Sequence, residues 1–154
     1  MDAHWLELTD TSTIRRPPSV VRSQFADIQH HADHEVHKAL RYEPLGTRDG
    51  RQRARTTLNL FGARLVDEIE LYVDAQGDVV QDFVAGRNVG GRITVHVDEV
   101  SPGVSRVTTH VRLPLRGPDR LLRPLIAWAF RRVLARSIAE DVADLEGGYA
   151  PRAA

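Results

Sequence analysis

The sequence predicts an α+β fold in which a curved antiparallel sheet of about seven strands packs against one long C-terminal helix, with a short helical region after the first strand. Two observations predict it. Apolar and polar residues alternate in successive segments between residues 38 and 113, with short turn signals between them. After Gly117 and Pro118 the apolar spacing becomes helical. Short links favour an antiparallel meander, because parallel strands need long crossovers.

The first element is a strand between Trp5 and Ile14, where apolar residues alternate with Thr and Ser. Pro17 and Pro18 end this strand. From Val20 apolar residues recur at helical intervals, which predicts a helix from about residue 18 to the low thirties. Six strands follow, centred on residues 40–42, 53–60, 65–73, 79–84, 93–100 and 107–113.

The last element is a helix of about 28 residues, or roughly 40 Å at about 1.5 Å per residue. Gly147 and Gly148 end it. A helix this long needs a wide apolar partner, and the inner face of the sheet is the only candidate. The whole chain, residues 1–154, then forms a single domain. The apolar stripe of the long helix comprises Leu121, Leu122, Leu125, Ile126, Ala129, Phe130, Val133, Leu134, Ile138, Val142 and Leu145.

Composition narrows the function classes. The chain has 154 residues, 42% hydrophobic and 27% charged, which is typical of a globular protein. Basic and acidic residues number 21 each, which argues against a nucleic-acid binder. The absence of cysteine excludes disulfides, thiolate metal sites and thiol catalysis within the chain. Neither a secretory signal nor a transmembrane run is found, so a cytoplasmic protein is expected.

Four of the seven histidines, His30, His31, His34 and His37, lie within eight residues. Neutral imidazole is the commonest transition-metal ligand, and clustered imidazoles otherwise repel one another once protonated. Helical spacing puts His31 on the apolar face with Ile28 and puts His34 at its edge. It puts His30 on the far side, and His37 follows the helix, where a loop could return it. A solvated polar helix end is the alternative interpretation.

A carboxylate near the end of the long helix completes a candidate metal site. Asp141 lies seven residues after Leu134 and three after Ile138, on the apolar stripe, whereas Glu140 points away. A buried aspartate needs a partner such as a cation, hydrogen-bond donors or a metal. Two histidines with one carboxylate form the facial triad of non-haem iron oxygenases.

The order of strand, helical region, six strands and long helix resembles that of the START-like, or polyketide cyclase, superfamily with its helix-grip fold. The resemblance covers nearly the whole chain. It implies a cavity between sheet and helix that holds an apolar small molecule. The superfamily includes lipid carriers, cyclases, hydrolases and oxygenase domains, so the fold does not decide the function.

Within it, the chain most resembles the catalytic domain of Rieske-type ring-hydroxylating oxygenases. Glu140-Asp141-Val-Ala-Asp-Leu145-Glu146 is similar to that family's final-helix motif and implies Asp141 as a ligand. Asp27-x2-His30 resembles the opening of its early-helix motif, but the later histidines are spaced differently. The metal candidates are therefore His31, His34 and His37, which helical spacing ranks above His30, together with Asp141, and Asp27 is the catalytic candidate.

The implied cofactor is mononuclear non-haem iron, with zinc as the alternative. The expected enzyme is oxygenase-like and acts on an apolar or aromatic substrate. Without cysteine the chain has no Rieske cluster, so its electrons would come from a separate electron-transfer protein or the substrate. The other hypotheses are a zinc-dependent hydrolase or cyclase and a non-catalytic START-like carrier. We expect the arginines of the long helix to form its solvent-exposed face rather than a membrane-binding surface.

Overall fold

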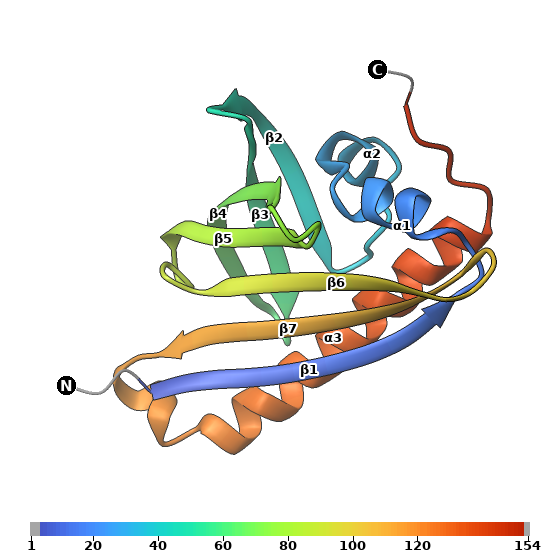
Figure 1. Cartoon of the computed structure of the whole chain (residues 1–154). Coiled ribbons are helices and arrows are strands. Elements are labelled where there is room, and N and C mark those ends of the chain that lie inside the picture. Colours follow the sequence, from blue (N-terminus) through green and yellow to red (C-terminus); the bar gives the residue numbers. More distant parts are fainter. Residues whose placement is uncertain (1–3, 153–154) are drawn as a thin grey trace.

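The computed structural model describes residues 4–152 and confirms the predicted α+β architecture (Figure 1). One seven-stranded sheet, with each neighbouring pair antiparallel, has the order β1-β7-β6-β5-β4-β3-β2. Its strands are β1 (His4–Ile14), β2 (Leu40–Arg48), β3 (Arg51–Leu60), β4 (Ala63–Val73), β5 (Val79–Gly86), β6 (Arg92–Ser101) and β7 (Val104–Leu115). The β2–β7 meander therefore runs in chain order, and β1 closes its far edge against β7.

The helical region after β1 is broken into two short helices, α1 (Pro18–Phe25) and α2 (Ile28–Asp33). The prediction of one continuous helix was wrong because Asp27 starts a new helix. Its carboxylate accepts the backbone N–H of His30 as the N-cap of α2. The chain after α2 then leads through His34 and His37 to β2.

Helix α3 (Arg123–Glu146) follows a short 3₁₀ turn, η1 (Gly117–Arg120), and runs along β1 and β7 (Figure 1). Its C-terminal half lies beside α1, so that the helix end meets the segment that carries the histidines. The core between helix and sheet includes Leu6, Ile69, Leu113 and Leu145. This packing brings residues more than 100 positions apart in the sequence together.

The start of α3 differs from the predicted apolar stripe. Leu121, Leu122 and Leu125 are exposed, whereas Ile126 and Phe130 pack against the core. Leu121 and Leu122 precede the helix, which begins at Arg123, so the helical spacing used to place them does not apply there. In the described residues, no helix is long and apolar enough to cross a membrane.

Candidate functional site

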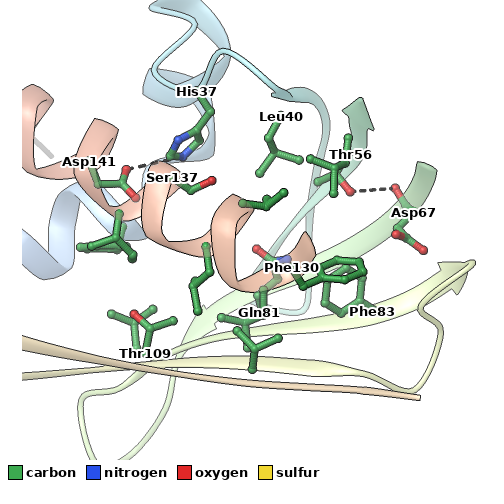
Figure 2. A pocket seen from close by; sticks show the side chains of 18 of the residues that line it. His37, Leu40, Thr56, Asp67, Gln81, Phe83, Thr109, Phe130, Ser137 and Asp141 are labelled. Atoms are coloured by element: carbon green, nitrogen blue, oxygen red, sulfur yellow. Dashed lines mark hydrogen bonds and ion pairs between the residues drawn. The ribbon is translucent and has the colours of Figure 1, made fainter. Parts of the chain in front are cut away.

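A cavity lies between α3 and the concave face of the sheet (Figure 2). Measured to the centre of a water molecule, its volume is about 160 Å³. Its walls are mostly apolar and include Leu8, Leu71, Phe83, Val111 and Phe130. This is the arrangement of a small-molecule site, where apolar walls hold a ligand and a few polar groups orient it.

Three buried side chains converge in the wall of the cavity: His31 from α2, His37 from the following loop and Asp141 from α3. One candidate ligand atom of each lies within 4.8 Å of the other two. His31 Nε2 is 3.0 Å from Asp141 Oδ1, and His37 Nε2 is 3.5 Å from the same oxygen. Figure 2 shows His37 and Asp141 facing each other across the end of the cavity.

The far nitrogen of each histidine is held by a separate acceptor. His31 Nδ1 lies 2.8 Å from the backbone carbonyl oxygen of Asp27, and His37 Nδ1 lies 3.2 Å from Glu140 Oε2. A proton on each Nδ1 satisfies these contacts and leaves each Nε2 lone pair directed at the Asp141 side. Metal-binding histidines are oriented in this way by the groups behind them.

The surroundings of His31 favour its positively charged form. Burial disfavours the imidazolium form and lowers the pKa of His31. The hydrogen bond and negative charge of Asp141, with smaller contributions from Asp27 and Asp144, outweigh burial and raise this pKa above 6.5. The site thus attracts positive charge, which a proton or a metal ion can supply.

Two of the sequence-predicted site residues lie outside this convergence. His34 is exposed, and its ring stacks on His30 at 4.3 Å between centroids, away from His31 and His37. Asp27, the catalytic candidate, does not line the cavity. Its carboxylate caps α2 and accepts the Tyr149 hydroxyl, and its carbonyl oxygen orients His31. Asp27 therefore contacts the cluster only through its hydrogen bond with His31.

Sequence reasoning missed the residues around the cluster. His30, expected on the far side of its helix, is buried because the end of α3 covers that side, and its Nε2 lies 2.8 Å from Asp144 Oδ2. Glu140, expected to point away, contacts His37, which returns along the flank of α3. Gln24 is fully buried and donates to both Asp141 and Asp144. The acidic residues at positions 140, 141 and 144 were the signal in the sequence that could have indicated these contacts.

The residues fit a divalent metal of the transition series. Two imidazole nitrogens and one carboxylate oxygen are the donor set that iron and zinc accept. Ligand atoms about 2.0–2.2 Å from a metal lie roughly 3–3.5 Å apart, close to the 3.0 and 3.5 Å separations observed. All three candidate ligand atoms lie within 4.8 Å of one another, so side-chain movements would be needed to bring them to one ion, which would lie in the wall of the cavity.

A second polar region lies at the opposite end of the cavity (Figure 2). The buried Asp67 carboxylate accepts the backbone N–H and the side-chain amide of Asn88, at 2.7 and 2.8 Å. Gly86, at φ +98°, permits this approach, because a Cβ there would lie 2.7 Å from Asp67. The Thr109 hydroxyl, also buried in the cavity wall, has no hydrogen-bond partner among the described residues.

The tyrosine beside the histidines stays protonated. Tyr42 lines the cavity 5.6 Å from the His31 ring, between ring centroids. Burial, and then the charge of Asp141, raise the pKa of Tyr42 far above its ordinary value. Its hydroxyl therefore stays neutral and keeps the proton that it can donate in a hydrogen bond.

The chain matches one family model, described as "Polyketide cyclase / dehydrase and lipid transport", over residues 6–146. No curated protein sequence is similar enough to count as a relative. Similar solved structures include the protein TTHA0849 from Thermus thermophilus, with 16% identity, a TM-score of 0.83 and coverage of 94% of this chain and 100% of that one. The Zhui aromatase/cyclase from Streptomyces sp. R1128 has 16% identity, a TM-score of 0.78 and coverage of 93% and 94%.

A START superfamily protein from Mycobacterium smegmatis is similar too, at 16% identity, a TM-score of 0.69 and coverage of 90% of this chain and 98% of that one. At these identities the structures share the fold alone. The comparisons support the START-like, polyketide cyclase assignment. They bring no support to the narrower resemblance to Rieske oxygenase catalytic domains.

Proposed function

This chain belongs to the polyketide cyclase, dehydrase and lipid transport family, and from that premise we propose that it is a metal-dependent enzyme acting on an apolar or aromatic small molecule. The observation that carries the proposal is the convergence of His31, His37 and Asp141 at one end of an apolar cavity. Each imidazole is already oriented by its own acceptor. Two imidazoles and one carboxylate are the ligand set of a facial triad, which supports the proposal.

Different residues of the chain bind the substrate, orient it and hold the imidazoles. The apolar wall binds the substrate and excludes water, which strengthens electrostatic interactions in the site. Tyr42, as a neutral donor, and Thr109, whose hydroxyl has no partner within residues 4–152, orient its polar groups. Asp27 and Glu140 hold the imidazoles in place. A bound metal would supply Lewis acidity and activate a small oxygen-containing ligand beside the substrate.

The identity of the metal separates the two enzymatic classes. Near-stoichiometric iron in untagged protein, with oxygen consumed in the presence of a reductant, supports the oxygenase-like function. Zinc supports metal-assisted hydrolysis, where a bound water of lowered pKa attacks. The second candidate function, a metal-free carrier or cyclase, is favoured by the family description and by the size and apolar lining of the cavity. It predicts ligand binding in protein stripped of metal.

Glu140→Gln tests the proposed site through a residue that touches no substrate. The amide keeps the size of the side chain but weakens the acceptor behind His37 Nδ1. We expect zinc or iron affinity to fall about 10–100-fold, with the unfolding temperature nearly unchanged. Competition with a chromophoric chelator measures this affinity. Arg136→Gln is the matched control, since Arg136 contacts only the outer oxygen of Glu140. Equal affinity in wild type and Glu140→Gln would refute the role of His37 as a ligand.

The stability of the metal-free protein and the stabilisation by a metal should depend on pH in opposite directions. The raised pKa of His31 means that the folded metal-free protein holds this proton more tightly than the unfolded chain. The proton therefore stabilises the protein below about pH 6.5, and this contribution is lost as pH rises through the raised pKa. Metal competes with the same proton, so the metal-induced increase in unfolding temperature should grow from about pH 6 to about pH 8. Differential scanning fluorimetry with and without chelator measures it. A pH-independent increase would contradict binding at His31.

A further inference from the structure

Five large apolar side chains form one exposed ridge at the start of α3, away from the His31–His37–Asp141 cluster. Leu121 is 87% exposed, and Leu125 and Trp128 follow one turn and two turns later at 58% and 47%. The Phe61 ring, 73% exposed at the tip of the β3–β4 hairpin, stacks parallel on Trp128 with 5.7 Å between centroids. With Leu122, these residues are called the apolar ridge. Large exposed apolar patches rimmed by polar residues mark interaction sites.

The apolar ridge is flanked by arginines. Arg64, Arg123, Arg131 and Arg132 are exposed, and none forms an ion pair with any residue of the described range 4–152. Arg132 lies over the Trp128 ring at 5.2 Å. From 116 to 136 the chain has six arginines and one acid, Asp119, which is paired with Arg87. The acids of α3 all lie at its other end, from Glu140 onward. Although the net charge of the whole chain is zero, the start of α3 is both strongly basic and apolar.

From this arrangement we propose that the apolar ridge docks on an anionic lipid bilayer surface. Leucines that project from a helix start can enter the boundary between headgroups and acyl chains, and the arginines flanking them pair with lipid phosphates. The Trp128 ring, with an arginine over it, is suited to the same interface. The next turn of α3 carries Phe130, Val133 and Leu134, which line the cavity. A bilayer at the ridge would therefore lie beside the wall of the ligand site.

A second copy of the chain fits the ridge less well. A symmetric dimer through the ridge would set the arginines of one copy against the same arginines of the other. In the described residues the ridge has no free carboxylate that could pair with them, because Asp119 is engaged by Arg87. A surface with dense negative charge and an apolar interior satisfies both the arginines and the leucines. The sequence-based expectation of a merely solvated arginine face did not include exposed leucines on the same turn.

Flotation of the full chain with lipid vesicles tests the proposal. The vesicles are pure phosphatidylcholine or an equal mixture of phosphatidylcholine and phosphatidylglycerol. We expect binding to the mixed vesicles only, weakened by salt. Arg123→Glu with Arg131→Glu should reduce partitioning on the order of 25-fold or more, at about fivefold for each arginine lost. Leu121→Ser with Leu125→Ser should reduce it by a similar factor.

Matched controls carry the same changes elsewhere. Arg41→Glu with Arg48→Glu alters exposed arginines of β2, and Val73→Ser with Val100→Ser alters side chains 51% and 47% exposed. Both controls should bind vesicles like wild type, and the ridge variants should keep wild-type metal content. The proposal is overturned by equal binding to both vesicle types or by ridge variants that bind normally. It is also overturned if the ridge instead mediates self-association in size-exclusion chromatography, or binds polyglutamate while ignoring vesicles.

Discussion

Asp141→Asn should abolish metal binding while leaving the fold intact. The asparagine has the same shape as the aspartate, but it removes the carboxylate that both His31 Nε2 and His37 Nε2 approach. Zinc bound by four protein ligands gains about 10–16 kcal/mol, so one ligand contributes about 3 kcal/mol or more. That corresponds to about a 100-fold or greater loss of affinity. Metal content by plasma mass spectrometry and competition with a chelator measure the loss.

Asp144→Asn is the control for Asp141→Asn. It lies on the same helix three residues on, contacts Gln24 and His30, and stands outside the triad. Its metal content should equal that of wild type. If Asp144→Asn lost the metal and Asp141→Asn kept it, the ligands would be His30 and Asp144, and the assignment of the site would be wrong. Circular dichroism of both variants checks that the fold is unchanged.

Ser137→Phe should obstruct the cavity without removing the metal. Ser137 faces the cavity from α3, one turn before Asp141 (Figure 2). A phenyl ring there would project into the cavity and occupy space that a ligand needs. We expect binding of N-phenylnaphthylamine, a neutral fluorescent probe, to weaken at least about 100-fold, since burial of a ring-sized apolar group contributes about 3 kcal/mol. Fluorescence titration measures this change.

Ala135→Phe is the matched control on the exposed side of the same helix. It adds the same ring two residues away and should bind the probe like wild type. Metal content should be normal in both variants. Probe binding that survives Ser137→Phe would place the ligand site outside this cavity.

Much of the fold follows from local patterns. The six alternating segments between residues 38 and 113 all became strands, because period-two alternation with short turns leaves few alternatives to a meander. The helix break at Asp27 was missed. The apolar spacing of residues 21–32 continues through the break unchanged. The break is marked by the capping hydrogen bond that the backbone N–H of His30 donates to the Asp27 carboxylate. Local hydrogen bonds of this kind compete with helical periodicity.

The candidate site was predictable in part. His31 and Asp141 were both placed on apolar faces by spacing alone, and the structure brings them to 3.0 Å. His37 depended on a loop whose path the spacing does not specify. Glu140 and His30 were placed facing away because helical periodicity describes only one partner surface, whereas α2 also contacts Asp144 and the flank of α3 also contacts His37. The exposure of Leu121 was missed because the helix begins only at Arg123, whereas helical spacing was extended back to residue 121.

The most direct test of the central claim is a crystal structure of untagged protein supplied anaerobically with iron, and separately with zinc, read by anomalous scattering. The proposed site predicts one peak about 2.0–2.2 Å from His31 Nε2, His37 Nε2 and an oxygen of Asp141, facing the cavity. A peak at His30 and His34 instead, or an intact His31–Asp141 hydrogen bond with no peak at all, would contradict a metal-dependent function at this site.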